Sequence, residues 1–274
     1  MTSFQLNEKT ATFLSKYKLF EDDIIQQVQL QHRIDLVEAF DIQEGMRVLE
    51  IGCGQGDTTM AIADAVGETG HVVAIDIASP NYGAPLTLGQ ATDRIKKSPL
   101  GNRITFHFEQ DFETFVTSTP FDMAVLSHSS WYFRQPEDLE LYFKKLRKIT
   151  KRFCFAEWDL DFTDMSQRSH FCAVSIVALY SSFIQNEGNI QNLFDKVQIQ
   201  QFLMDSGFQI EKQLPVDATY LQDGQWEKSY ANSIRSELIN ISPMLQTLLT
   251  SYYDLMNSQN ENEQSLNSFV ICAK

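Results

Sequence analysis

Apolar residues recur along the chain in short runs that alternate with helical patterns, and this alternation predicts the fold class. The runs typical of strands cover residues 47–51, 71–77, 103–108, 121–126 and 153–158. The segments between them with apolar residues at three- and four-residue steps cover 57–66, 91–97 and 136–149. Strands alternating with helices at this spacing predict a mostly parallel sheet with helices on both faces.

The two ends of the chain add further elements to this α/β core. Residues 21–40 carry apolar side chains at helical spacing, with acids in the first turn. After residue 159 we expect a long apolar helical segment at 165–185, a helix at 196–206 that Gly207 ends, and further helix at 226–255. Two late strands, 208–214 and 266–272, bring the total to seven, and the hydrophobic pattern leaves their order in the sheet open.

The segment with the most specific chemistry follows the first predicted strand. Val48-Leu49-Glu50-Ile51 runs into Gly52-Cys53-Gly54-Gln55-Gly56 and then into a helix that begins near Asp57. Glycine has no Cβ and tolerates positive φ, so this turn lets the backbone approach a ligand closely. Open α/β sheets bind ligands at this place, beyond the carboxyl ends of the strands.

An acid at the end of the second predicted strand narrows the class of ligand. Asp76 follows Val72-Val73-Ala74-Ile75 and stands 20 residues after Gly56. A carboxylate there can accept hydrogen bonds from the vicinal hydroxyls of a ribose. The glycine turn and the acid together predict a cofactor that contains a nucleoside.

The spacing of the glycines distinguishes between nucleoside cofactors. Dinucleotide enzymes use G-x-G-x-x-G, in which the helix N-terminus faces a pyrophosphate. Here the spacing is G-x-G-x-G, and Asp57 stands where the third glycine would be needed. Asp57 would repel a pyrophosphate but not S-adenosylmethionine (SAM), which has no phosphate and carries a sulfonium cation. Glu50, at the end of the strand, favours the same choice.

These motifs resemble those of the class I SAM-dependent methyltransferases. The stretch from Val48 to Gly56 resembles their motif I, and Asp76 matches the acid that ends their second strand. Further similarities are Glu109-Gln110-Asp111-Phe112 after the third strand, Phe121 to His128 at the fourth, Met204 to Phe208 before the sixth, and Phe269 to Cys272 at the seventh. The resemblance covers residues 42–160 and 195–274. It implies a Rossmann-like, seven-stranded, mostly parallel sheet with an antiparallel C-terminal edge strand.

The resemblance also implies which residues bind the cofactor. In that family the glycine turn lies against the methionine part and the ribose, the second-strand acid binds the ribose, and the acid after the third strand accepts from the adenine amino group. The implied cofactor-binding residues are Glu50, Gly52, Cys53, Gly54, Gly56, Asp76, Ile77, Asp111, Phe112 and Ser127.

Candidates for the acceptor side are less specific. His128 is the best single candidate for a catalytic base because imidazole titrates near neutral pH, but a histidine at this position more often belongs to a pocket wall and is held there by a hydrogen bond to the backbone. Trp131 and Tyr132 follow it and suit either an acceptor wall or the core. Glu157 ends the fifth strand, where it would contact the acceptor or serve the structure. Tyr17 would reach the site from the N-terminal helices.

We expect two parts in the chain. Residues 1–41 would form a helical N-terminal cap, and residues 42–274 the methyltransferase domain with a helical insertion at about 160–194. In the segment 79–90, Pro and Gly are frequent, and this link is longer than usual after the ribose acid. It would either cover the nucleoside or form a surface loop.

Composition restricts partners and location. The net charge of −14 disfavours nucleic acid as a substrate, because phosphate binding draws on Lys and Arg. No apolar run is long enough for a membrane span, and the first residues do not resemble a secretory signal, so we expect a cytoplasmic protein. The four cysteines form no zinc-ligand pattern, and we expect no bound metal. The oligomeric state stays open, a homodimer included.

The sequence therefore predicts an enzyme that moves the methyl group of SAM to a small-molecule acceptor by in-line displacement. Three alternatives remain at this point. They are a nicotinamide-dependent oxidoreductase, which the glycine spacing and Asp57 disfavour; a non-catalytic SAM-binding protein of the same fold; and methylene transfer to a lipid, for which no basic membrane-binding helix is evident.

Overall fold

The computed structural model describes residues 5–20, 22–238, 241–258 and 262–274, and over these residues seven strands form one sheet. The strand order is β3-β2-β1-β4-β5-β7-β6, with β7 antiparallel to both of its neighbours. The strands are β1 (Arg47–Ile51), β2 (His71–Ile75), β3 (Ile104–His107), β4 (Phe121–Ser127), β5 (Thr150–Trp158), β6 (Ile210–Val216) and β7 (Ser268–Ala273). This is the predicted Rossmann-like arrangement.

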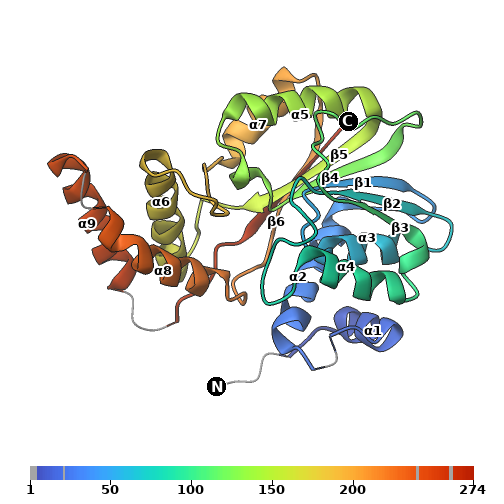
Figure 1. The fold of residues 1–274 in the computed structure, drawn as a ribbon, viewed down its shortest axis with the longest axis horizontal. Helices are drawn as coiled ribbons and strands as arrows, with labels where there is room; N and C mark the ends of the chain where they lie inside the picture. The colour runs from blue at the N-terminus through green and yellow to red at the C-terminus, as the bar shows by residue number, and fades with distance from the viewer. Residues whose placement is uncertain (1–4, 21, 239–240, 259–261) are drawn as a thin grey trace.

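Helices cover both faces of the sheet, as Figure 1 shows. One face packs against α5 (Pro136–Ile149) and α7 (Lys196–Asp205), and the other against α2 (Ile24–Phe40), α3 (Asp57–Ala65) and α4 (Leu88–Lys97). Alternate residues of the strands belong to the two hydrophobic cores. Leu49 packs in the core that contains α5, and Val48 packs in the core that contains α2 and α3. A parallel sheet buried on both faces explains why its strands appear in the sequence as nearly continuous apolar runs.

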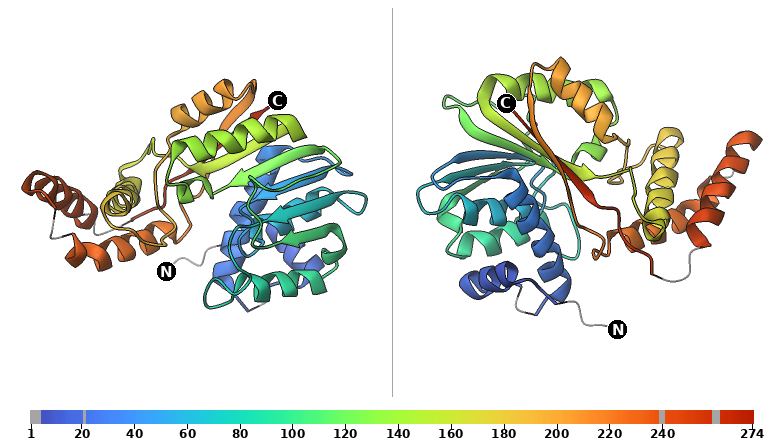
Figure 2. Two further views of the ribbon diagram at one scale, coloured as in Figure 1. Left: turned by 45° about the horizontal axis from the view of Figure 1, so that its top comes forward. Right: turned by 180° about the vertical axis from the view of Figure 1, so that it is seen from behind.

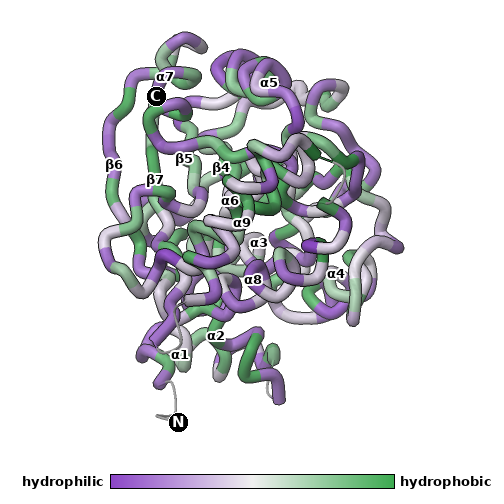
Figure 3. Tube along the Cα trace, turned by 90° about the vertical axis from the view of Figure 1, so that its left-hand side faces the viewer, coloured by the Kyte–Doolittle hydropathy of each residue, from purple (hydrophilic) through white to green (hydrophobic). Residues whose placement is uncertain are grey.

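The position of the last strand corrects our expectation. β7 is antiparallel as expected, but it is the second strand from the edge, because β6 pairs with its outer side. All six residues of β7 are buried, whereas β6 alternates between half-buried and exposed residues and contains Pro215. Figure 3 shows the same contrast in hydropathy. A continuous apolar strand suits the interior of a sheet, and a strand with proline suits its edge.

Several element bounds agree closely with the sequence pattern. β1 and α5 have the predicted bounds, because glycine follows the one and Pro136 opens the other. Residue 21, where we expected the helix over 21–40 to begin, lies outside the described residues. α2 begins at Ile24 because the Asp23 side chain accepts a hydrogen bond from the amide of Gln26.

A helical unit of three helices stands beside the sheet. α6 (Arg168–Phe183) packs against both α8 (Asp223–Ser233) and α9 (Pro243–Asn257), and both views in Figure 2 place the three to one side of the strands. We expected an insertion only at 160–194, which holds α6. The other two helices lie between β6 and β7, so the unit is assembled from two separate segments of the chain.

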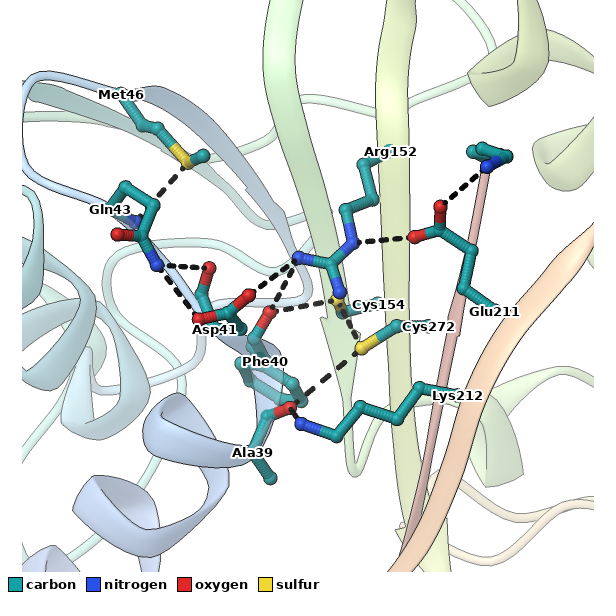
Figure 4. Close-up of polar contacts among 11 residues, drawn as sticks. Ala39, Phe40, Asp41, Gln43, Met46, Arg152, Cys154, Glu211, Lys212 and Cys272 are labelled. Carbon is teal, nitrogen blue, oxygen red and sulfur yellow. Dashed lines mark hydrogen bonds and ion pairs between the residues drawn. The ribbon is translucent and has the colours of Figure 1, made fainter.

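The C-terminal end of α2 is fixed to the sheet by cations and thiols (Figure 4). The carbonyl of Ala39 accepts from Lys212 Nζ at 3.0 Å, and that of Phe40 accepts from Arg152 Nη1 at 3.2 Å. Cys154 and Cys272, facing each other on β5 and β7, also donate to these carbonyls. Positive groups at a helix C-terminus satisfy its free carbonyls and its dipole, which holds α2 against β5, β7 and β6.

Candidate active site

The glycine turn after β1 has the geometry that close ligand approach requires. Gly52 (φ 74°) and Gly54 (φ 52°) both adopt left-handed conformations that other residues reach only with strain. A Cβ on Gly52 would lie 2.7 Å from Ser129 Cβ, whereas a Cβ on Gly54 would meet no atom within 4 Å. The first glycine is therefore required by packing, and the backbone of the second faces open space.

Asp76 joins the turn to the end of the second strand. Its Oδ2 accepts a hydrogen bond from the amide of Gly54 at 2.7 Å, and its Oδ1 accepts one from the amide of Ala78 at 2.8 Å. Each carboxylate oxygen has a second lone pair, so Asp76 keeps acceptor capacity for ligand hydroxyls. The amide of Gln110, after β3, donates to the backbone carbonyl of Asp76 at 3.0 Å and brings a third strand end to this place.

A cavity of about 730 Å³ opens at this edge of the sheet. Its volume lies within the usual range for small-molecule sites. It is lined mainly by residues from the ends of β1, β2 and β4, from the segments after β2 and β3, from α5, and from the segment after α6. The lining residues are Ile51, Gly52, Gly54, Gln55, Asp57, Ile75, Asp76, Ile77, Ala78, Ser79, Tyr82, Gly83, Ala84, Leu88, Gln110, Phe112, His128, Ser129, Tyr132, Phe133, Arg134, Tyr142, Asn186, Glu187, Gly188 and Gln191.

Two loops form much of the cavity wall beyond the sheet. The segment after β2, whose role the sequence left open, contributes Tyr82, Gly83 and Ala84, and Gln55 Nε2 ties it to the glycine turn through the carbonyl of Leu86 at 2.9 Å. The segment 186–191, after α6, supplies the second loop. It is joined to the segment after β4, because the amides of Gln191 and Asn192 donate to the carbonyl of Trp131.

Of the two residues expected at the adenine, one lines the cavity and the other does not. Phe112 lines the cavity, with its ring 5.0 Å from that of Tyr142 in an edge-to-face contact. Asp111 does not line it, because its Oδ1 accepts from the Tyr142 hydroxyl and the Glu113 amide, both at 2.7 Å. Burial, and secondly the hydrogen bond to Asp111, raise the pKa of Tyr142 above its ordinary value. With Asp111 turned away, Gln110 and Tyr142 are polar residues of the wall that adjoin Phe112, the first in sequence and the second in space.

Besides Asp111, four more of the expected cofactor residues lie outside the cavity lining. Glu50 faces α3, where the Thr59 hydroxyl donates to it at 2.5 Å, and burial raises its pKa to about 8. The Cys53 thiol is buried, and burial raises its pKa well above the ordinary value. Gly56 serves packing, because a Cβ there would lie 2.7 Å from Ile95 Cδ1. Ser127 contacts His128 Nδ1 at 3.2 Å and lies outside the cavity lining.

His128 lines the cavity, but both of its ring nitrogens are already engaged. Nδ1 lies 3.2 Å from Ser127 Oγ, and Nε2 lies 2.9 Å from Ser268 Oγ. Burial, and secondly the positive charge of Arg33, hold its pKa well below the ordinary value, so the ring is neutral. His128 therefore presents no free nitrogen to the cavity in this structure.

Of the other acceptor-side candidates, only Tyr132 lines the cavity. The Trp131 ring is buried in the core that contains α5 and α6. Glu157 is buried and accepts from Ser130 Oγ at 2.7 Å, and burial raises its pKa to about 7. Tyr17 lies on α1 (Glu8–Tyr17), where its hydroxyl donates to Asp64 of α3, so as placed it does not reach the cavity.

Several residues of the wall were not found from the sequence. Tyr82, Gln110, Tyr142 and Gln191 lie on loops or on the cavity side of α5. No motif contains Tyr82, Tyr142 or Gln191, and Gln110, although it lies in the stretch that resembles the family after the third strand, was not expected to bind the cofactor. The Pro- and Gly-rich composition of 79–90 was the one available signal. No described helix is long and apolar enough to cross a membrane. Within the described ranges, no three His, Cys, Asp or Glu side chains are grouped to hold a metal ion.

Comparison with known proteins identifies similar sequences and structures. Residues 48–152 match the family model described as a methyltransferase domain. A crystal structure of a cyclopropane-fatty-acyl-phospholipid synthase-like protein from Lactobacillus casei superposes with a TM-score of 0.87 at 33% identity, over 97% of this chain and 98% of that one.

Curated relatives match over a shorter region. A demethylmenaquinone methyltransferase from Shouchella clausii is 36% identical over 103 residues, which are 37% of this chain and 44% of the relative. The methyltransferase phomM from Diaporthe leptostromiformis is 31% identical over 120 residues, 37% of this chain and 31% of the relative. The chain thus spans less than half the length of these two curated relatives.

Proposed function

The chain belongs to the class I SAM-dependent methyltransferase family, and from this premise we propose that it transfers the methyl group of SAM to a small-molecule acceptor. The sulfonium of SAM is already a strong electrophile, so the protein's task is to hold the acceptor, the methyl carbon and the sulfur in line. The observation that carries this proposal is the cavity where the open backbone of Gly54 meets the Asp76 carboxylate.

The wall residues fit the parts of SAM. The free lone pairs of Asp76 suit the ribose hydroxyls, and Ile77 and Phe112 suit the two faces of the adenine. Gln110 offers its side-chain Oε1 to the adenine amino group, because both hydrogens of its Nε2 are donated to the Asp111 carbonyl and to Thr114 Oγ1. Asp57, at the start of α3, places a carboxylate on the same wall, which favours a cationic cofactor over a pyrophosphate.

The part of the cavity beyond the proposed SAM contacts would hold the acceptor. Tyr82, Tyr132 and Phe133 give it aromatic surface. Asn186 and Gln191 donate their amide hydrogens within their own segment, and the Gln191 Oε1 atom, which has no partner among the described residues, gives the cavity a hydrogen-bond acceptor. Most of these residues come from the loop after β2 and from the segment next to the helical unit, so both act as a cap that closes over a small molecule. A cavity of about 730 Å³ that is shared with SAM leaves space for an acceptor of limited size.

Calorimetric titration with SAM, S-adenosylhomocysteine and NADH tests the cofactor assignment. We expect binding of the first two and none of NADH, and NADH binding alone would identify an oxidoreductase. Incubation with SAM and a panel of amines, phenols and thiols, followed by mass spectrometry, tests for turnover. Tight SAM binding without any methylated product would favour a non-catalytic SAM-binding protein.

A second candidate function rests on the similar structure from Lactobacillus casei, which is named a cyclopropane-fatty-acyl-phospholipid synthase-like protein. It would be the transfer of the SAM methyl carbon to an acyl-chain double bond, in which that carbon forms bonds to both alkene carbons, S-adenosylhomocysteine leaves and one methyl proton is lost to solvent. Vesicles of unsaturated phospholipid, incubated with the protein and SAM, separate the two candidates. A cyclopropane-containing lipid would support the second, and methylation of a soluble acceptor with unchanged lipid would support the first.

A further inference from the structure

A chain of hydrogen bonds runs from α2 to the end of β4 behind the cavity. Arg33 Nη1 lies 3.0 Å from His32 Nδ1, and His32 Nε2 lies 3.0 Å from Ser268 Oγ. Ser268, the first residue of β7, also contacts His128 Nε2 at 2.9 Å. His128 Nδ1 then contacts Ser127 Oγ at 3.2 Å. Two imidazoles from distant parts of the sequence therefore share one serine hydroxyl.

Arg33 determines which ring nitrogen of His32 carries the proton. A guanidinium is always charged, has five donors and cannot accept, so Arg33 donates and His32 Nδ1 accepts. Burial, and secondly the charge of Arg33, hold the pKa of His32 well below its ordinary value, so the ring is neutral. A neutral imidazole carries one proton, which for His32 must then lie on Nε2. His32 therefore donates to Ser268 Oγ.

Ser268 passes the same donor-to-acceptor order on to His128. Its side chain is completely buried, and its hydroxyl has a single hydrogen to donate. Among the described residues, His128 Nε2 is the one partner of this hydroxyl that can accept the hydrogen, since His32 Nε2 already carries a proton. Leaving the hydrogen unpaired in a buried place would cost a lost hydrogen bond. Ser268 therefore donates to His128 Nε2, and the proton of His128 lies on Nδ1.

We propose that Arg33 is a positioning residue that, through His32 and Ser268, fixes His128 as the Nδ1–H tautomer with its lone pair directed at Ser268. His128 is then a neutral part of the cavity wall and does not take a proton from the acceptor. Reversing the chain would place a proton on His32 Nδ1 against the guanidinium, which has no lone pair to receive it. The conclusion that His128 does not take a proton from the acceptor rests on the proposed function. The assignment of the two tautomers does not depend on it.

Nuclear magnetic resonance of the full chain tests the proposal without any ligand. In protein labelled with ¹⁵N-histidine, long-range ¹H–¹⁵N correlations report which ring nitrogen carries the proton. The chain has five histidines, so His32→Gln and His128→Gln identify the two sets of signals. We expect protonated Nδ1 for His128 and protonated Nε2 for His32 between pH 6 and 8. A protonated Nε2 on His128, or an imidazolium in this range, would overturn the proposal.

Substitutions test the role of Arg33 itself. Arg33→Met keeps the length of the stem but removes the donor, so both rings should lose their single-tautomer signals. Arg33→Lys restores a group that donates and cannot accept, and it should restore those signals. Arg147→Met, which removes a guanidinium from α5 that donates to the Gly207 carbonyl, should leave the signals of both rings unchanged. Single-tautomer signals that persist in Arg33→Met would contradict the role of Arg33.

Ser268→Ala provides an independent test if Arg33→Met fails to fold. Without the hydroxyl, His32 should keep its tautomer, since Arg33 remains, whereas His128 should populate both. An unchanged His128 spectrum in this variant would overturn the relay through Ser268. Because SAM binding is measured separately, correct tautomers in a protein that ignores SAM would reject the proposed function and leave this inference standing.

Discussion

The Oδ2 atom of Asp76 lies 2.7 Å from the amide nitrogen of Gly54, so the acid that ends β2 is hydrogen-bonded to the turn that follows β1. This contact joins the two motifs that the sequence separates by more than twenty residues. It also orients the carboxylate toward the cavity, which both residues line.

The first prediction concerns this acid. Asp76→Ala removes the proposed ribose acceptor, and we expect SAM affinity to fall about 5- to 150-fold, the effect of losing roughly 1–3 kcal/mol of charged hydrogen bonding. Calorimetry on the folded variant measures it. Asp93→Ala removes an exposed acid from α4 and should bind SAM as the wild type does. Equal affinities for the two variants would remove Asp76 from the site.

The second prediction separates two neighbouring glycines. Gly52→Ala and Gly54→Ala both force a left-handed backbone on alanine, at a cost of about 1–2 kcal/mol. Only the first also brings a Cβ to 2.7 Å from Ser129, so its urea midpoint should fall further. Gly54→Ala should instead lose SAM affinity, because its Cβ enters the cavity.

A second substitution serves as the control for this pair. Ser129→Gly removes the atom that the new Cβ of Gly52→Ala would meet, so the double variant should regain part of the lost stability. If Gly54→Ala proved the less stable of the two single variants, the assignment of packing to Gly52 and ligand approach to Gly54 would be reversed.

The third prediction concerns pH. Burial raises the pKa of Glu50 from its ordinary 4.5 to about 8, so the folded protein binds this proton more tightly than the unfolded chain. The contribution of Glu50 to stability is therefore complete below pH 4.5 and declines as pH rises to about 8, by up to roughly 1.4 kcal/mol per unit. Glu50→Gln should remove this decline.

Denaturation in urea at pH 5, 6, 7 and 8 measures the effect. The stability of Glu50→Gln relative to wild type should increase at each step, because wild type loses stability as pH rises and the amide does not titrate. The amide oxygen can still accept the hydrogen bond from Thr59. Glu44→Gln, at an exposed position, should show no such trend. A constant difference between Glu50→Gln and wild type across this range would mean that Glu50 is ionised throughout.

The fourth prediction addresses the acceptor side. Tyr132 lines the cavity but makes no part of the proposed cofactor contacts, so Tyr132→Ala should raise the KM of the acceptor by about tenfold and leave SAM affinity unchanged. Tyr132→Phe keeps the ring and should retain most of the wild-type KM. A parallel loss of SAM affinity in Tyr132→Ala would place this tyrosine at the cofactor instead.

The sequence predicted the core of the fold well, because the residues that end or begin each element and the apolar patterns within it are local in the sequence. Gly52 ends β1, Pro136 opens α5, and the apolar runs identify the strands. The place of β7 was missed, although its unbroken apolar run and the proline in β6 carried the signal. The helical unit was half missed, since periodicity predicted helix over 226–255 but not that α8 and α9 pack on α6.

The site was predictable only where a residue sits on a strand end. Gly54 and Asp76 follow from motifs, whereas Tyr142 reaches the cavity from a helix and Asn186 from a loop. The pairing of Asp111 with Tyr142, which turns that acid away from the cavity, joins residues 31 apart. The contact of His32 with Ser268 spans 236 residues, and no local pattern records it.

A crystal structure with S-adenosylhomocysteine bound tests most directly whether this cavity holds SAM. We predict the ribose hydroxyls on the Asp76 carboxylate, the adenine beside Phe112, and the sulfur facing the part of the cavity that Tyr132 lines. S-adenosylhomocysteine bound elsewhere, or an empty cavity at saturating ligand, would contradict the assignment.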